Sequence, residues 1–161
     1  MRSILLTNGG EALVDDQDFD WLNQWCWHRS KSGYARHSLK KPDPVYGFAI
    51  YMHKLILGLG SGEMGDHRDR NPLNNQRYNL RPATNAKNQW NTGTRVHNTS
   101  GRKGISWDRN RGKWIAHFMH NGQMKHVGRF TSLEEATSRY DQMVIALKGD
   151  FAITNAALGL I

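Results

Sequence analysis

The stretch DHRDRNPLNNQRYNLRPATNAKN, residues 66–88, decides how this chain is expected to fold. Residues 62–79 are crowded with Asp, Asn and Arg, which cannot form an apolar core but can form a loop held by side-chain to backbone hydrogen bonds. Residues 79–81 then predict a short strand, and Thr84 is a predicted N-cap for a helix that runs through Asn91. The sequence therefore predicts a polar loop, a strand and a helix.

The polar residues of this stretch also suggest a chemistry. Hydrolysis of a phosphodiester needs an activated water, a cation near the phosphorus and stabilisation of the departing 3′ oxygen. Asp66 and His67 are neighbours at a predicted strand end, so one side chain can hold a metal while the other faces water. Asn88 lies one helical turn after the predicted N-cap, where its amide oxygen can project towards that metal. An isolated Asp-His pair is usually a surface loop, and only its spacing from Asn79 and Asn88 favours a site.

With these residues in this order, the stretch resembles the HNH homing endonucleases encoded by phages, in the variant whose third motif residue is asparagine. The resemblance implies a ββα-metal fold, with His67 as general base and Asn79 orienting its imidazole. It also implies that Asp66 and Asn88 hold one divalent ion. Oxygen ligands favour a hard ion, so we expect Mg²⁺ or Mn²⁺ rather than Zn²⁺. His53, upstream in the same resemblance, is left open between packing, phosphate contact and catalysis.

Charge indicates a polyanionic partner. The chain has 161 residues, 38% of them hydrophobic, and a net charge of +8. Residues 1–52 have six basic and six acidic side chains, residues 53–100 have seven against three, and residues 101–129 have seven against one. We therefore expect nucleic acid to bind the second and third of these segments.

Several classes of protein are disfavoured by composition. Cys26 is the only cysteine, so an internal disulfide or a CxxC zinc site is excluded. The sequence has neither an apolar run of membrane-spanning length nor the apolar stretch of a signal peptide near its start. We expect a soluble protein of the infected host's cytoplasm, with no membrane partner and no small-molecule cofactor.

The N-terminal part predicts a small β-rich region. Residues 4–14 predict a hairpin whose turn contains Asn8-Gly9, and Asp15 or Asp16 is expected to cap a short helix. Short strands are predicted at 27–29 and 34–37, with a loop at Pro42 and Pro44. A strand that runs into a short helix is predicted at 48–57.

The last third predicts a three-stranded antiparallel sheet and one helix. Strands are expected at 104–108, 113–119 and 125–130, followed by a capping box at 132–135 and an apolar helical stripe that ends at Gly149. Residues 100–155 resemble the ethylene-response-factor DNA-binding domain, which implies DNA contacts from the sheet. The candidate DNA-binding residues are Trp107, Arg109, Arg111, Lys113, His117, Lys125 and Arg129. The target sequence cannot be transferred, because Ser106 and Asp108 stand where the plant regulators tend to have arginine.

The expected fold class is α+β: a ββα-metal nuclease motif with a small N-terminal β-rich extension, and a C-terminal three-stranded sheet packed on one helix. The expected domains are 1–91 and 100–161, joined by a linker at 92–99. The predicted function is a metal-dependent endonuclease for double-stranded DNA that nicks as a monomer or cuts both strands as a homodimer. The alternatives are a DNA-binding regulator with an inactive site and an RNA-binding or nucleoprotein-assembly factor.

Overall fold

The computed structural model describes residues 1–94 and 96–161 and contains both helices and strands. Residue contacts divide it into two compact units, Met1–Asn88 and Gln89–Ile161. The second unit therefore begins before the predicted linker at 92–99, and Arg95 of that linker lies outside the described residues. Whether the mixed fold is of the ββα-metal type stays a prediction. In the described residues no helix is both long and apolar enough to cross a membrane.

The first unit opens with a hairpin and a short helix. Strands β1 (Arg2–Leu5) and β2 (Glu11–Val14) pair antiparallel, as predicted, and α1 (Asp16–Leu22) follows. Asp15 is the N-cap residue of α1, but its carboxylate makes no capping hydrogen bond. It accepts instead from the backbone N–H of Arg77 at 2.8 Å and from Nε2 of Gln76 at 3.1 Å. The predicted capping role of this side chain is therefore wrong, because a distant segment uses the carboxylate.

A second sheet has the order β3 (His28–Arg29), β4 (Ala35–Asp43) and β5 (Gly47–Tyr51). Strand β4 is longer than the predicted 34–37 and runs through Pro42. Its pairing with β5 is irregular between Ser38 and Asp43, which is where a strand tolerates proline. Helix α2 (Met52–Leu57) follows β5 directly and ends at Gly58, whose φ of 66° is left-handed.

The stretch quoted above forms two strands and a helix. Strand β6 (Met64–His67) pairs antiparallel with β7 (Leu80–Ala83), and α3 (Asn85–Trp90) follows. Strand β7 begins one residue and ends two residues after the predicted strand at 79–81, and α3 follows the predicted N-cap Thr84 directly and ends one residue before the predicted Asn91. The apolar core of this unit is formed by the hairpin, α1, the second sheet and α2, with Leu80 as its contribution from β7.

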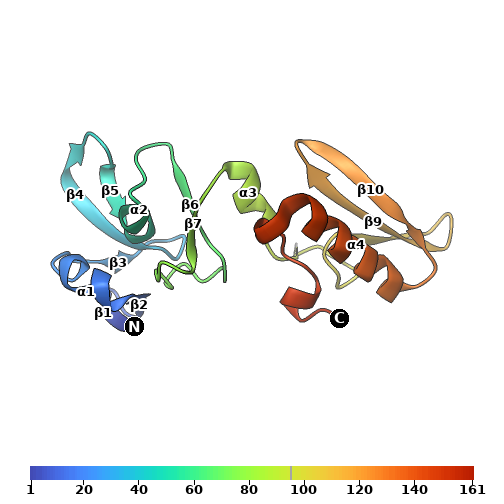
Figure 1. The fold of residues 1–161 in the computed structure, drawn as a ribbon, viewed down its shortest axis with the longest axis horizontal. Coiled ribbons are helices and arrows are strands. Elements are labelled where there is room, and N and C mark those ends of the chain that lie inside the picture. Colours follow the sequence, from blue (N-terminus) through green and yellow to red (C-terminus); the bar gives the residue numbers. More distant parts are fainter. Residues whose placement is uncertain (95) are drawn as a thin grey trace. The chain divides into compact units, whose positions relative to one another are not determined.

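The second unit packs one helix on one sheet. Strands β8 (Ile105–Asp108), β9 (Lys113–His120) and β10 (Gln123–Phe130) form an antiparallel sheet, and α4 (Leu133–Lys148) lies across it (Figure 1). Short 3-10 turns follow at Gly149–Phe151 and Ala156–Leu158. The predicted N-cap of α4 is confirmed, since Oγ of Ser132 accepts from the backbone N–H of Glu135 at 3.2 Å.

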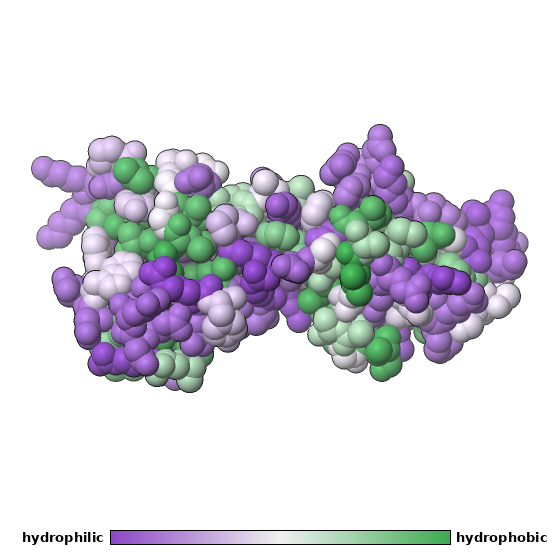
Figure 2. Space-filling view, viewed as in Figure 1, coloured by the Kyte–Doolittle hydropathy of each residue, from purple (hydrophilic) through white to green (hydrophobic). Residues whose placement is uncertain are grey.

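Only part of the predicted apolar stripe of α4 is buried. Ala136, Tyr140 and Val144 belong to the core of the second unit, together with Ile105 and Phe118 of the sheet. In contrast, the side chains of Met143 and Leu147 are exposed. Figure 2 shows apolar side chains at the surface over this helix. The sheet is narrower than the stripe, so it covers only the central residues of the helix face.

Candidate active site

Strand β6 holds two candidate residues next to one another in the first unit. Asp66 and His67 are buried, with 5% and 4% of their surface exposed. Their Cα partners on β7 are Arg81 and Leu80. Successive strand residues face opposite sides, so the carboxylate and the imidazole have different surroundings.

The imidazole of His67 packs in an aromatic cluster. We call Tyr34, Tyr51, His53 and His67 the imidazole cluster. The His67 ring centroid lies 5.0 Å from that of His53 and 5.6 Å from that of Tyr34. Gly65 leaves room for the ring of His53 in this cluster, because a Cβ at position 65 would lie 2.8 Å from Cδ2 of His53. The cluster thus fixes the ring of His67 against the end of β6.

His67 has the protonation state of a general base. Burial lowers the pKa of its imidazole, although the hydrogen bond to Asn75 and the charges of Asp69 and Asp66 act in the opposite direction. Nε2 of His67 lies 3.4 Å from Oδ1 of the fully buried Asn75. A carbonyl oxygen can only accept, so Nε2 carries the proton and Nδ1 has the lone pair. A neutral ring of this tautomer can take a proton at Nδ1.

His53 differs from His67 in its basicity. Burial, followed by the charges of His67 and Lys54, lowers the pKa of His53 to about 3. Within residues 1–94 and 96–161 its buried Nδ1 has no hydrogen-bond partner, and the same holds for Nδ2 of Asn75. Burial also raises the pKa of Tyr34, with smaller effects from Asp66 and Tyr51. Both imidazoles of the cluster are therefore uncharged at neutral pH.

Asp66 forms a buried ion pair. Its Oδ2 accepts from Nε of Arg81 at 2.7 Å and lies 2.6 Å from the terminal nitrogen Nη2 of Arg81. Both of these contacts end on the same carboxylate oxygen. The oxygen donors of Asp66 and Asn88 have the chemistry that a hard divalent ion prefers. In the described part of the chain no group of three or more His, Cys, Asp or Glu could hold a metal, so water and phosphate would have to supply further ligands.

The side-chain amide of Asn79 forms hydrogen bonds with the loop that follows His67. Its Nδ2 donates to Oδ1 of Asp69 and to the carbonyl of Asn74, both at 2.8 Å, and its Oδ1 accepts from the backbone N–H of Asp69 at 2.9 Å. Both N–H groups of the amide are used on the loop, so the amide does not donate to the imidazole of His67. Asn79 therefore braces the loop that follows His67, and its predicted role in orienting the imidazole stays a prediction.

The N-terminal hairpin and helix hold the same loop from the other side. The backbone of Leu13 bonds with Leu73 and with Asn75, each at 2.8 Å. Asp18, itself buried, accepts from Nε and Nη2 of Arg77 at 2.8 and 2.7 Å. Neither Tyr34 nor Asn75 is among the predicted site residues, although both contact His67. Such contacts join segments far apart in the chain, and no local spacing signals them.

Asn88 lies in α3, in the same unit as β6. Its backbone N–H donates to the carbonyl of Thr84 at 2.9 Å, and the side chain is half-buried. The structure thus brings Asp66, His67 and Asn79 together around β6 and β7 and places Asn88 on the helix that follows. A metal-ligating role for Asn88 stays a prediction.

The sheet of the second unit sorts its predicted DNA-binding residues onto two faces. Residues opposite one another in an antiparallel pair share a face. Trp107 pairs with Trp114 and Lys125 with the core residue Phe118, so both lie on the face that α4 covers. Lys113, His117 and Arg129 lie on the other face, which we call the open face. DNA contacts from Trp107 and Lys125 stay a prediction, and the register places both residues on the helix side of the sheet.

The remaining two predicted DNA-binding residues lie at the turn between β8 and β9. Arg109 lies between these strands, and Nη1 of Arg111 is 3.4 Å from Oδ2 of Asp108. Nε of Arg129 lies 3.5 Å from the same oxygen. Asp108 thus neutralises part of the positive charge at this end of the sheet.

Comparison with known proteins finds viral relatives of this chain. Protein 3.8 of Escherichia phage T7 is 39% identical over 87 residues, which span 54% of this chain and 71% of that protein. The chain belongs to the family of phage T7 protein 3.8. An uncharacterized HNH endonuclease, L560 of Acanthamoeba polyphaga mimivirus, is 29% identical over 154 residues, or 91% of this chain and 75% of that protein. No family model and no solved structure matches. The resemblance of residues 100–155 to the ethylene-response-factor domain gains no support and stays a prediction.

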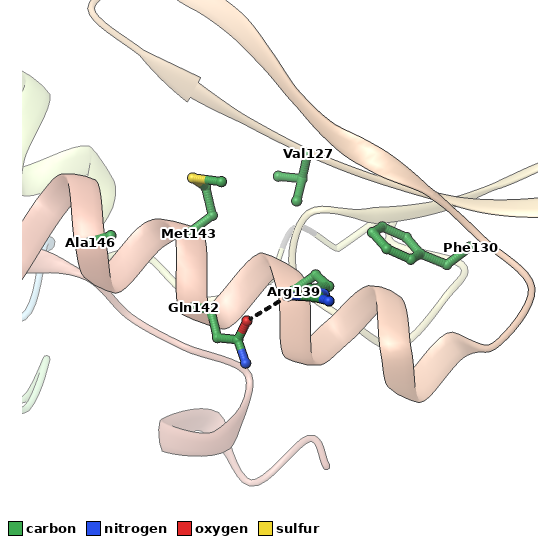
Figure 3. Close-up of a pocket in the computed structure, with 6 residues that line it drawn as sticks. All are labelled: Val127, Phe130, Arg139, Gln142, Met143 and Ala146. Atoms are coloured by element: carbon green, nitrogen blue, oxygen red, sulfur yellow. Dashed lines mark hydrogen bonds between the residues drawn. The ribbon is translucent and has the colours of Figure 1, made fainter.

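This relative of protein 3.8 also has an apolar groove in its second unit. The groove has a volume of about 370 Å³ and lies between α4 and β10 (Figure 3). Its lining includes Val127, Phe130 and Met143, and its one charged residue, Arg139, lies 3.4 Å from Oε1 of Gln142 through Nη1. The groove lacks a base or a metal ligand among these lining residues, so hydrolytic chemistry is better assigned to the cluster around His67.

Proposed function

We propose that this protein is a metal-dependent DNA endonuclease of the HNH type that hydrolyses phosphodiester bonds. The observation that carries the proposal is the buried, neutral imidazole of His67 beside the carboxylate of Asp66 at the end of β6. It is supported by the mimivirus relative, whose name is that of an HNH endonuclease and which aligns with 91% of this chain. The net charge of +8 suits a nucleic-acid substrate.

His67 acts as the general base in the proposed reaction. Its Nδ1 takes a proton from water while the water oxygen bonds to phosphorus, and the bond from phosphorus to the 3′ oxygen breaks. The departing oxygen takes a proton from solvent, which leaves a 5′ phosphate and a 3′ hydroxyl. A divalent ion, Mg²⁺ or Mn²⁺, would be held by Asp66 and Asn88. When bound, it would stabilise negative charge on the phosphate and the leaving oxygen.

His67 suits this role better than His53. A base with a pKa of about 3, as in His53, has little tendency to take a proton at neutral pH. His67 has Asn75 on Nε2 and the charges of two aspartates nearby, which favour its protonated form after the transfer. The site therefore stabilises the protonated imidazole of His67 that the reaction produces.

The second unit supplies DNA affinity in this proposal. Lys113 and Arg129 lie on its open face with His117, and β-strands can enter the major groove. One active site cuts one strand at a time. A monomer should therefore nick DNA, whereas a homodimer could break both strands.

Cleavage of supercoiled plasmid tests the proposal. Wild-type protein with Mg²⁺ or Mn²⁺ should produce nicked circles, and EDTA should stop the reaction. His67→Ala should lower the rate by about 10²- to 10⁴-fold, the usual contribution of a general base. His97→Ala is the matched control, because this histidine is exposed and belongs to the other unit. Equal rates for wild type and His67→Ala would contradict the assignment, and an intact plasmid with every metal and DNA sequence would contradict the nuclease function.

Metal binding can be measured without cleavage. Titration calorimetry with Mn²⁺ should detect a site that weakens in Asp66→Asn and in Asn88→Ala, while His67→Ala should retain it. The variants should differ in Mn²⁺ affinity because the imidazole of His67 is proposed as a base, whereas the oxygens of Asp66 and Asn88 are proposed as metal ligands. Unchanged Mn²⁺ affinity in both ligand variants would overturn the proposed donor pair.

A further inference from the structure

One face of the sheet β3-β4-β5 packs on the apolar core of the first unit, and the other face points away from that core. Ala35 and Ile50 are buried in the core, and they define the first face. Side chains alternate along a strand, so Arg36 of β4 lies on the second face. Its Cα partners across the sheet are His28 of β3 and Tyr51 of β5. Tyr51 and Arg36 thus share a face that is distinct from the core.

This second face is continuous with the imidazole cluster. The ring of Tyr51, the cross-strand neighbour of Arg36, lies 5.9 Å from that of His53 and 6.2 Å from that of Tyr34. Both of these rings contact His67, at 5.0 and 5.6 Å. Arg36 is therefore the cross-strand neighbour of one member of the cluster that surrounds the proposed base.

The guanidinium of Arg36 is incompletely bonded. In the part of the chain that the structure describes, Nε of Arg36 is buried and has no hydrogen-bond partner. Leaving a buried charged donor without a hydrogen bond is energetically costly, and native proteins rarely do so without a reason. The imidazole cluster beside it offers no carboxylate of its own. An anion that arrives with the substrate would complete the bonding.

We propose that Arg36 binds a non-bridging oxygen of the scissile phosphate. This inference rests on the proposed nuclease function and adds a phosphate-binding residue to it. Guanidinium groups hold phosphate through two parallel N–H···O bonds, in which Nε and a terminal nitrogen both donate. Such donors matter most when negative charge on the phosphate oxygens increases in the transition state. Arg36 therefore contributes to the rate of cleavage more than to the affinity for DNA.

Single-turnover cleavage with three variants tests this role. Arg36→Ala should lower the rate about 10²- to 10³-fold, as loss of one transition-state donor does. Arg36→Lys keeps the charge and the aliphatic stem but loses the fork, and should recover only part of that loss. Arg29→Ala, in the neighbouring strand and paired with Ala35, removes an exposed cation on the other face and should cleave like wild type. Rates for Arg36→Ala within about threefold of Arg29→Ala would overturn the proposal while leaving the nuclease function intact.

A binding measurement applies even if cleavage fails. In EDTA, the ¹⁵N spectrum of the protein should contain one arginine Nε–H signal that is absent in Arg36→Lys. Adding short duplex DNA should shift this signal, and the same DNA should bind Arg36→Ala and Arg29→Ala with affinities within about threefold of each other. A signal that stays in place while DNA binds would overturn the proposed phosphate contact. Plasmid left intact by the wild type would instead contradict the nuclease function.

Discussion

The polar loop of the first unit and the sheet-helix packing of the second unit are stabilised by different kinds of interaction. In the second unit, α4 covers a three-stranded sheet through an apolar core that includes Ile105, Phe118 and Tyr140. In the first unit, the loop between β6 and β7 is held by amides and carboxylates, among them Asn79 and Asp69. Apolar packing tolerates small shifts of side chains, whereas hydrogen bonds fix individual atoms. We infer that the polar loop of the first unit holds individual atoms in fixed positions, and that the apolar core of the second unit keeps its sheet surface stable.

The largest effect on stability should come from adding a methyl group at Gly104, in the packed core of the second unit. A Cβ at Gly104 would lie 2.0 Å from Cε2 of Tyr140, and the φ of 72° disfavours any other residue. Gly104→Ala should destabilise the second unit by about 3–5 kcal/mol in urea unfolding followed by amide signals. Gly112→Ala is the matched control, because its φ of 59° is similar but its Cβ position is open. Equal losses for both variants would show that packing at Gly104 contributes nothing beyond backbone strain.

The next effect should come from removing one amide of the polar loop. Asn79→Ala deletes the contacts to Asp69 and Asn74 inside a buried site and should cost the first unit about 2–3 kcal/mol. Asn71→Ala, at an exposed position with one side-chain hydrogen bond to Leu73, should cost less than about 1 kcal/mol. Hydrogen exchange of the amides in residues 68–79 reports the difference. Similar protection in the two variants would contradict the bracing role of Asn79.

A smaller effect should follow from pH. The folded-state pKa of His53 is about 3 against an ordinary value of 6.5, so below pH 6.5 the unfolded chain binds a proton that the folded chain does not. This stabilisation is complete above pH 6.5 and is lost as the pH falls towards 3. From about pH 7 to about pH 5, wild type should lose about 2 kcal/mol more than His53→Gln in the first unit. Parallel stability curves for the two proteins would show that burial does not depress this pKa.

The smallest effect concerns the open face of the second unit. Lys113→Ala removes one cation that can meet a phosphate, so the slope of log affinity against log salt should decrease by about 0.9. Arg139→Ala, which removes a cation from α4, should leave the slope as it is. Fluorescence anisotropy with duplex DNA between about 50 and 200 mM salt measures both slopes. If Arg139→Ala has the larger effect, the helix rather than the sheet contacts DNA.

Sequence patterns predicted the regular elements of both units. The turn at Asn8-Gly9, the cap at Ser132 and the ends of β6, β7 and α3 depend on neighbours a few residues away, and such signals can be read locally. Strand β4 was underestimated because Pro42 suggests a loop, whereas an irregular pairing accommodates it. On the sheet of the second unit, the face of Trp107 depends on strand register, which spacing alone does not determine.

The candidate site was only partly predictable for a related reason. Asp66 and His67 are adjacent in the chain, so their pairing is visible in the sequence. Tyr34 and Asn75 reach His67 from other segments, and the unsatisfied Nε of Arg36 becomes apparent only when burial is known. The hydrogen bonds of Asn79 to Asp69 and Asn74 could not be predicted from spacing, because an amide has two donors and several competing acceptors nearby.

The rate of plasmid nicking as a function of pH tests the central claim most directly. Single-turnover rates with saturating Mn²⁺ should rise tenfold per pH unit while His67 loses its proton, and should level off below pH 6.5, because burial lowers the pKa of this imidazole. The residual rate of His67→Ala should lack that inflection. A wild-type profile that levels off above pH 6.5, or one that His67→Ala reproduces, would contradict a buried neutral His67 as the base.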